Sequence, residues 1–213
     1  MLLAEILSLA LLPFLATASV VQKGSDCYVY PEGPVDSFAA IDDAPSIKEA
    51  FSQCGHNGRV IFEPGVFNVG QVLNTTGLVN CDVILKGELR FSTDIPYWLS
   101  HSIWVIYQNQ HTAWLFGGEN VTFTVEEGGF YNGNGQAWYT QNRNRANQLG
   151  RPISMTFYQS KNLTVDGLAF IQPQFWAVHV WECEKVVLRN IYVTATSNDQ
   201  WGTVNTDGAD TCE

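Results

Sequence analysis

The sequence has few charged residues, and basic residues are the scarcest of them. Among its 213 residues, 11 are lysine or arginine and 21 are aspartate or glutamate, which gives a formal net charge of -10. Nucleic acids and anionic membrane surfaces are bound through positive fields. Both are therefore excluded as partners of this chain.

Paired metal-binding cysteines and nucleotide-binding loops are also missing. No two of the five cysteines stand in a C-x-x-C pair, so their spacing favours disulfides over a zinc site. The odd count leaves one cysteine unpaired, and Cys27 with Cys54 is the pair we favour. Gly133-Asn134-Gly135 lacks the third glycine and the helix of a dinucleotide fingerprint, and no Gly-Lys-Ser/Thr follows it. The sequence therefore predicts neither a cofactor nor a metal.

The chain also lacks an apolar run long enough to cross a membrane. Its N-terminal stretch is apolar, but Pro13 and Thr17 interrupt it, and a spanning helix needs roughly 20 apolar residues. Ala16-Thr17-Ala18 has the small-x-small pattern of a signal peptidase site. We therefore predict a signal peptide over residues 1–18 and a secreted, extracellular protein without membrane contact after its removal.

Three N-x-Ser/Thr triplets agree with export. They begin at Asn74, Asn120 and Asn162, and only a protein on the secretory route can be glycosylated at such triplets. All three are predicted N-glycosylation sites.

Helical periodicity is confined to one early segment. Residues 45–54 follow two aspartates, begin at a proline, precede a glycine and carry one apolar stripe, as a short amphipathic helix does. The rest of the chain consists of short β-branched or aromatic runs between Gly, Asn and Asp, for example 59–62, 153–158 and 177–181. One further strand is expected over 202–205. Apart from the helix, the chain is predicted to be all-β.

A repeat is visible in the second half of the sequence. The run from Asn162 to Phe170 aligns with the run from Lys185 to Val193, apolar residue on apolar residue, at an offset of roughly 23 residues. Each copy reads as strand, sharp bend, strand, and stacked copies would bury their apolar residues against one another. An antiparallel sandwich would instead show hairpin signals about every 8 to 12 residues. We therefore predict a parallel β-helix, with the segment 45–54 capping its N-terminal end.

Two motifs stand out, and each has an ordinary reading when taken alone. Gly133-Asn134-Gly135-Gln136, followed by Trp138 and Tyr139, reads as a tight loop, and Asn205-Thr206-Asp207-Gly208 reads as an Asp-Gly turn at the end of a strand. Together with the 23-residue coils they resemble glycoside hydrolase family 28, the polygalacturonase family, and most of all its fungal exo-acting members. The resemblance runs from about Asp42 to the last residue. It covers only the N-terminal part of such enzymes.

This resemblance implies a right-handed parallel β-helix over residues 19–213 that hydrolyses α-1,4-galacturonosidic bonds of pectin or polygalacturonate with inversion. Asp207 matches the family aspartate that helps activate the attacking water, and Asn205 of the same motif is an expected substrate-binding residue. Trp138 and Trp201 are expected to bind substrate as well, because aromatic rings can stack on sugar rings. The adjacent aspartates that supply the family's general acid, and its Gly-His-Gly and Arg-Ile-Lys motifs, have no match before Glu213. We therefore expect a C-terminally truncated chain, whose own activity the sequence leaves open, and a monomer at full length.

Other readings stay open at this point. The chain is alternatively a non-catalytic pectin-binding β-helix, a rhamnogalacturonan hydrolase or, with the weakest support, a pectate-lyase-like enzyme, which would need calcium carboxylates and a basic residue. Asp210 is close to Asp207 in sequence, but is expected in the turn and in a structural role. Arg143, Arg145 and Arg151 form a basic cluster that either meets the carboxylates of a polyuronate or lies on a solvated loop.

Overall fold

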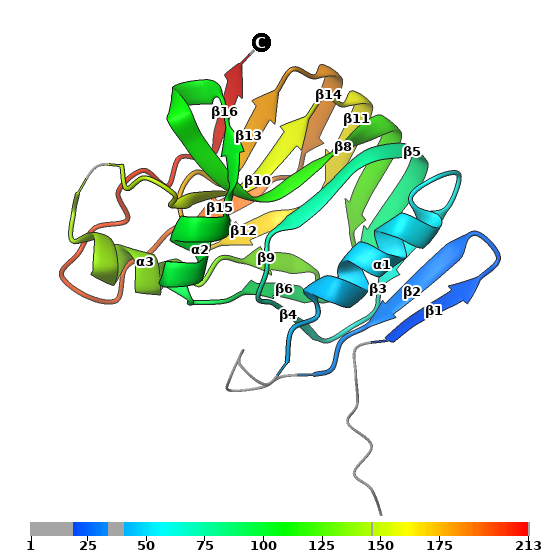
Figure 1. The fold of residues 1–213 in the computed structure, drawn as a ribbon, viewed down its shortest axis with the longest axis horizontal. Coiled ribbons are helices and arrows are strands. Elements are labelled where there is room, and N and C mark those ends of the chain that lie inside the picture. The colour runs from blue at the N-terminus through cyan, green and yellow to red at the C-terminus, as the bar shows by residue number, and fades with distance from the viewer. Residues whose placement is uncertain (1–18, 34–40, 146, 213) are drawn as a thin grey trace, which may run out of the picture.

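The fold is a parallel β-helix whose coils stack along one axis (Figure 1). The computed structural model describes residues 19–33, 41–145 and 147–212, so the predicted signal peptide lies outside the described part. Two sheets contain the described strands, and all the pairings between coils are parallel. The predicted all-β class and the predicted β-helix are therefore confirmed.

Each complete coil has three faces. Face 1 is built from the start of β5, the start of β8, and β10, β13 and β16; face 2 from β2, β3, the ends of β5 and β8, β11 and β14; face 3 from β4, β6, β9, β12 and β15. The strands are β2 (Asp26–Tyr30), β3 (Arg59–Phe62), β4 (Val66–Val69), β5 (Leu73–Leu85), β6 (Glu88–Phe91), β8 (Gln110–Val125), β9 (Phe130–Asn132), β10 (Pro152–Tyr158), β11 (Lys161–Asp166), β12 (Ala169–Ile171), β13 (Val178–Trp181), β14 (Glu184–Arg189), β15 (Tyr192–Thr194) and β16 (Ala209–Cys212).

The strand register confirms the predicted repeat. Leu163 on β11 pairs with Val186 on β14, and Phe170 on β12 pairs with Val193 on β15, which is the alignment expected from the sequence. Side chains alternate across each strand, so one residue of every pair of neighbours points into the helix. The 23-residue offset is therefore one full coil.

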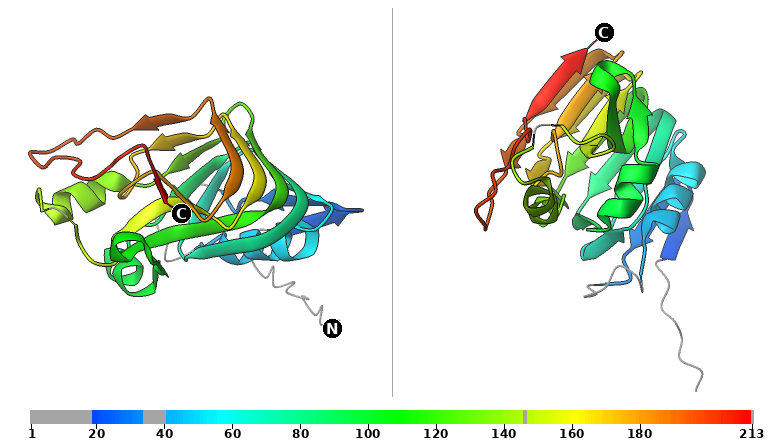
Figure 2. Two further views of the ribbon diagram at one scale, coloured as in Figure 1. Left: turned by 90° about the horizontal axis from the view of Figure 1, so that it is seen from above. Right: turned by 60° about the vertical axis from the view of Figure 1, so that its left-hand side comes forward.

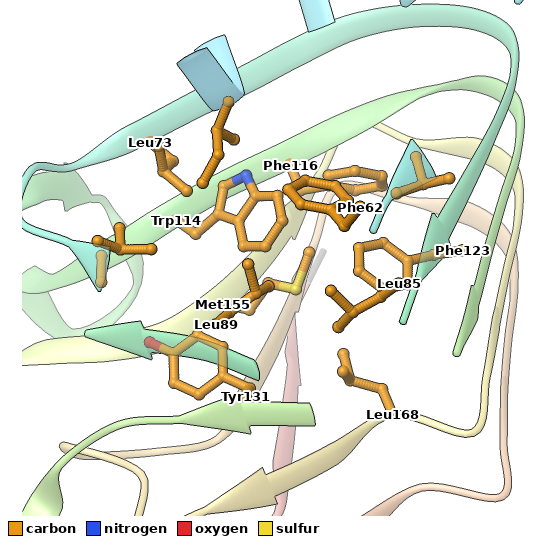
Figure 3. Close-up of a cluster of buried hydrophobic side chains, with 14 of the residues drawn as sticks. Phe62, Leu73, Leu85, Leu89, Trp114, Phe116, Phe123, Tyr131, Met155 and Leu168 are labelled. Atoms are coloured by element: carbon orange, nitrogen blue, oxygen red, sulfur yellow. The ribbon is translucent and has the colours of Figure 1, made fainter. Parts of the chain in front are cut away.

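Large apolar side chains fill the interior of the helix (Figure 3). The rings of Trp114, Phe116 and Phe123 lie edge to face at centroid distances of 5.7–6.1 Å, and all three are fully buried. Burial of a side chain of this kind stabilises the fold by roughly 1.5–3 kcal/mol. Because each coil supplies only a few such residues, stacking of successive coils is what completes the core.

A helix covers the N-terminal end of this core. Helix α1 (Ala44–Cys54) buries the predicted apolar stripe, and Phe51 packs against Phe62, Trp114 and Phe116. Beside it, β1 (Ser19–Lys23) forms an antiparallel hairpin with β2, and a disulfide joins Cys27 on β2 to Cys54 on α1, the predicted pair. Cap and first coil are thus tied covalently.

Several elements were not expected from the sequence. Helix α2 (Ile95–His101) begins after Asp94, whose side chain accepts a hydrogen bond from the Tyr97 N–H, and it carries a proline in its first turn. Both features are typical of a helix start, but the strand-like sequence on either side led us to predict only strands here. Strand β7 (Ile103–Val105) and the 3-10 turn η1 (Tyr107–Asn109) follow it. The predicted loop over the glycine-rich motif is partly helix α3 (Gly135–Asn142).

Candidate active site

The carboxylate of Asp207 is exposed at the start of face 1 in the last described coil. Its backbone carbonyl accepts a hydrogen bond of 2.8 Å from the N–H of Ala177, one coil below, which holds the main chain in the parallel ladder. Among the described residues, no group donates a hydrogen bond to the Asp207 carboxylate and no cation pairs with it. The side chain is therefore held in place by its backbone and is free to bind a ligand.

The predicted strand over 202–205 is wrong. Asn205 has a φ of 58°, in the left-handed region, and lies in a turn before β16 begins at Ala209. A left-handed residue breaks the alternation of an extended chain, so the sequence argument that Asn205 and Asp207 share a strand face does not hold. Both residues still belong to one exposed corner, because only Thr206 separates them and its hydroxyl is bound to the Thr203 carbonyl at 2.7 Å.

Helix α3 anchors the long loop that leads to this corner. The Gln136 side-chain carbonyl accepts the Asn198 N–H at 2.6 Å, Thr140 Oγ1 donates to Asp199 Oδ2 at 2.5 Å, and the Asn144 side chain accepts the Gly202 N–H at 2.6 Å. The helix and the loop lie side by side at one edge of the molecule (Figure 2). The hydrogen bond from Thr140 also holds the pKa of Asp199 below its usual value. The segment that begins with the glycine-rich motif thus contacts the loop that leads to Asn205–Gly208.

The structure separates the two tryptophans proposed for substrate binding. Trp138 is fully buried on α3, so its ring offers no face to a sugar, and the sequence-based prediction for this residue is wrong. The reason is that the glycine-rich stretch forms a helix that turns Trp138 into the core. Trp201 is only partly buried; its backbone N–H donates to Asp199 Oδ1 at 2.8 Å, and the Arg143 guanidinium lies 6.0 Å from its ring centre. Trp201 remains a candidate.

An aromatic cluster on the outside of face 1, not predicted from the sequence, lies beside β16, the strand that follows the Asp207 corner. Tyr107 from η1 stacks on His179 at 5.5 Å, and Tyr158 lies 4.3 Å from Trp181. His179 and Trp181 stand on β13, which pairs with β16, and Tyr158 stands on β10, which pairs with β13; Trp181 and Tyr158 are partly exposed. Aromatic faces of this kind stack on sugar rings. The alternation of His179 and Trp181 along β13 is the sequence signal that could have revealed them.

Asp210 lies in strand β16 and not, as expected, in the turn. It pairs in register with His179, whose ring is fully buried and whose Nε2 lies 3.2 Å from Cys212 Sγ. Burial lowers the pKa of His179, and the nearby Asp210 opposes this shift. His179 is therefore neutral at pH 7 and belongs to the packing of face 1.

The three arginines of the predicted basic cluster do not share one environment. Arg143 and Arg145 are exposed, which agrees with the prediction of a solvated loop. Arg151 is buried, with 1% of its surface exposed. For Arg151, the solvated-loop reading is therefore wrong.

The three predicted glycosylation asparagines are exposed, but their side chains are engaged differently. Asn74 Oδ1 accepts a hydrogen bond of 2.9 Å from the hydroxyl of Thr76 in its own triplet. Asn120 and Asn162 belong to a ladder at the corner between faces 1 and 2: the Asn162 side-chain amide donates to Asn120 at 3.0 Å, and Asn120 donates to Asn80 at 3.1 Å. Each ladder residue has a φ near 50°, so the ladder stabilises a left-handed corner.

Neither a metal-binding cluster nor a membrane-spanning helix is found in the described ranges. No group of three His, Cys, Asp or Glu side chains there could hold a metal ion. None of the helices described is both long and apolar enough to cross a bilayer.

Comparison with known proteins gives consistent matches. The family model of the glycosyl hydrolases family 28 matches residues 59–213. The chain is 38% identical over 185 residues to Alpha-L-rhamnosidase rgxB of Aspergillus niger, covering 87% of this chain and 42% of that protein. It is 34% identical over 171 residues to the Exopolygalacturonase of Cochliobolus carbonum, covering 80% of this chain and 38% of that protein.

A solved structure supports the same fold. The chain superimposes on endo-xylogalacturonan hydrolase from Aspergillus tubingensis with a TM-score of 0.68 and 25% sequence identity, over 86% of this chain and 47% of that one. The chain thus spans less than half the length of each of these relatives.

Proposed function

Since the chain belongs to family 28 of the glycosyl hydrolases, we propose that it hydrolyses α-1,4-galacturonosidic bonds of pectin or polygalacturonate, and does so as an exo-acting, inverting enzyme. The observation that carries this proposal is the exposed, unpaired carboxylate of Asp207, held by its backbone at the corner that also contains Asn205. A relative named Exopolygalacturonase supports the substrate and the mode of attack.

In this proposal Asp207 acts as the base. Ionised, it accepts a proton from the water that attacks the anomeric carbon, while a second, protonated carboxyl group roughly 6.5–9.5 Å away donates to the glycosidic oxygen. The partly exposed rings of Tyr158 and Trp181 on face 1 would support the sugar ring, and Trp201 would contact it from the loop. The role of the acid is assigned to no residue, because no carboxyl group here matches the family's acid.

A second candidate is hydrolysis of α-L-rhamnosidic bonds in rhamnogalacturonan. One observation favours it: a relative named Alpha-L-rhamnosidase is 38% identical to this chain. The two candidates share the fold, the Asp207 base and inversion. They differ in the sugar released, galacturonate or rhamnose.

The test is release of sugar by the purified secreted protein from polygalacturonate and from rhamnogalacturonan oligosaccharides. Asp207→Asn should lower the rate by about 10²- to 10⁴-fold, because it removes a general base. Glu127→Gln is the matched acid-to-amide control, since Glu127 is exposed at a distant turn; its rate should equal that of the unaltered protein. Monogalacturonate as first product would support exo action, and oligomers would contradict it.

Other results would change the assignment. Rhamnose release without galacturonate would favour the second candidate. Binding of oligogalacturonate without hydrolysis of either substrate would favour a pectin-binding β-helix. An unsaturated, calcium-dependent product would indicate a lyase.

We also propose that the protein is secreted by a signal peptide over residues 1–18 and glycosylated. Asn74 is the strongest acceptor candidate, because its amide nitrogen is not committed to the asparagine ladder that contains Asn120 and Asn162. Mass spectrometry of the secreted protein after endoglycosidase treatment tests both the N-terminus at Ser19 and the occupancy of each asparagine. An N-terminus that retains residues 1–18 would contradict cleavage.

A further inference from the structure

The glycosylation triplet at Asn74 stands on a bulge of strand β5. The pairing of β5 with β8 shifts its register between Thr75 and Leu78, and Gly77 within this stretch has a φ of 77°. Thr75 is buried, whereas its neighbours Asn74 and Thr76 are exposed, as side chains that alternate along a strand are. The bulge thus presents both ends of the triplet to solvent.

The triplet itself orients the Asn74 amide. The side-chain oxygen of Asn74 accepts hydrogen bonds from the Thr76 hydroxyl at 2.9 Å and from the Thr76 N–H at 3.3 Å. Its Nδ2 atom, to which an N-glycan is attached, donates to no group in the described ranges. These bonds therefore fix the plane of the amide and leave its nitrogen open to a sugar.

A groove of about 210 Å³ begins at this asparagine and runs between α1 and the start of β5, which lie side by side (Figure 1). Its buried lining residues include Phe51 of α1 and Leu78 of β5, which are 5% and 3% exposed. The polar residues along it are Lys48, Ser52, His56, Asn74, Thr75 and Thr76. The Ser52 hydroxyl makes no hydrogen bond within the described part of the chain. The groove therefore combines an apolar floor with an unused polar group.

N-acetylglucosamine, the first sugar of an N-glycan, has surfaces of both kinds. Its ring C–H groups and acetyl methyl are apolar, and its hydroxyl and acetamide groups donate and accept hydrogen bonds. Because the sugar is attached to a residue of the groove, docking is intramolecular. The effective concentration of a group on a short tether is in the mM range, so a contact with a Kd of about 1 mM is already populated.

The position of Asn74 selects this groove over a larger one nearby. A groove of about 430 Å³ lies on the other side of the bulge, beside Tyr158 and Lys161. Thr76 lines both grooves, whereas Asn74 is a lining residue of the smaller groove and not of the larger one. A sugar on Asn74 therefore reaches the groove between α1 and β5 first.

We propose that the first N-acetylglucosamine on Asn74 docks into this groove and holds α1 against β5. The inference rests on the glycosylation proposed above and gives it a structural role. The sugar ties the N-terminal cap to β5, as the disulfide between Cys27 and Cys54 ties it to β2.

The test is hydrogen exchange of the α1 amides in the secreted protein. Trimming the glycan with an endoglycosidase that leaves one N-acetylglucosamine should not change their exchange, because only the first sugar occupies the groove. Thr76→Ala, which removes the acceptor triplet, should speed exchange about twofold or more, since an effective concentration about equal to Kd doubles the protected population. Thr76→Ser keeps the triplet and should exchange like the unaltered protein.

Two controls separate the sugar from the protein. Thr164→Ala removes the acceptor triplet at Asn162 on β11 and should leave the exchange of α1 unchanged. The protein produced without glycosylation reports the effect of losing the Thr76 hydroxyl alone. In that background, Thr76→Ala and the unaltered protein should exchange their α1 amides alike.

A variant that fills the groove tests where the sugar lies. Ser52→Tyr places a ring in the groove and leaves the glycan attached, so the exchange of α1 should no longer depend on the glycan. Gln53→Tyr is the matched control, because Gln53 is also exposed on α1 but is not a lining residue of the groove. In this control the dependence on the glycan should remain.

Mass spectrometry at Asn74 distinguishes two ways in which the inference fails. Secreted protein without a sugar on Asn74 would overturn both the docking and the glycosylation proposed for this residue. An occupied Asn74 with equal α1 exchange in Thr76→Ala and the unaltered protein would overturn the docking alone, and so would a glycan effect that persists in Ser52→Tyr. The hydrolysis test is independent of all these results.

Discussion

The pH dependence of stability should reveal the buried carboxyl group of Asp43. This residue precedes α1 and is fully buried, and its side chain accepts hydrogen bonds from the N–H groups of Asn68 at 2.6 Å and Glu32 at 3.2 Å. Burial outweighs these bonds and raises the pKa of Asp43 from 3.8 to about 6. The folded chain therefore holds this proton more tightly than the unfolded chain.

The sign and size of the effect follow from this difference. A raised folded-state pKa contributes stability that is complete below pH 3.8 and is lost as the pH rises through about 6. A difference of about two pKa units corresponds to about 3 kcal/mol. Because part of this contribution is already lost at pH 4, the contribution of Asp43 to the free energy of unfolding should fall by about 2 kcal/mol between pH 4 and pH 7.

Urea denaturation followed by tryptophan fluorescence at pH 4, 5, 6 and 7 measures this contribution. Asp43→Asn cannot titrate, so the stability of the unaltered protein minus that of the variant isolates Asp43 from the other carboxyl groups. This subtraction is needed because Asp26 and Asp166 have lowered pKa values and act in the opposite direction. A difference that stays constant or rises from pH 4 to pH 7 would refute the reasoning.

Three further predictions concern the covalent tie, the site loop and the core. Replacing Cys27 and Cys54 together by alanine should lower the free energy of unfolding by about 3 kcal/mol, since their disulfide closes a 27-residue separation; equal urea midpoints would contradict this. Gln136→Ala should speed proteolysis of the loop before β16 about fivefold, because loss of one hydrogen bond costs about 1 kcal/mol. Gln141→Ala, on the exposed side of α3, should leave the rate unchanged. Equal proteolysis rates in both variants would contradict the hydrogen bond from Asn198 to Gln136 as the contact that holds the loop. Trp114→Phe should lower the free energy of unfolding by about 2–3 kcal/mol, because it leaves the buried Thr75 hydroxyl without its hydrogen-bond donor and puts a smaller ring in the core. An unchanged melting curve would contradict this contribution of Trp114.

Much of the fold was predictable from local patterns. The 23-residue repeat requires a solenoid, because strand–bend–strand units at a fixed period can bury their apolar residues only by stacking. The apolar stripe of α1 likewise predicted a cap. Helix α3 was missed because its glycine-rich start resembles a loop, and its local hydrogen bonds do not show in the composition.

The site was predicted less completely. Asp207 could be chosen from its motif, but Trp138 was assigned to substrate binding because a sequence does not show which side of a helix faces the core. The aromatic cluster on face 1 was missed for a related reason: Tyr107 meets His179 only after an intervening segment folds back over the strands.

The sequence by itself determined the class of the fold and the spacing of its coils, because both depend on residue type and on separation along the chain. Only the tertiary structure decided which side chains lie beside one another across coils. It packed α3 against the loop that carries Trp201, and it buried Arg151 without a counter-charge. Burial and charge compensation depend on neighbours that are distant in sequence, and no local pattern encodes them.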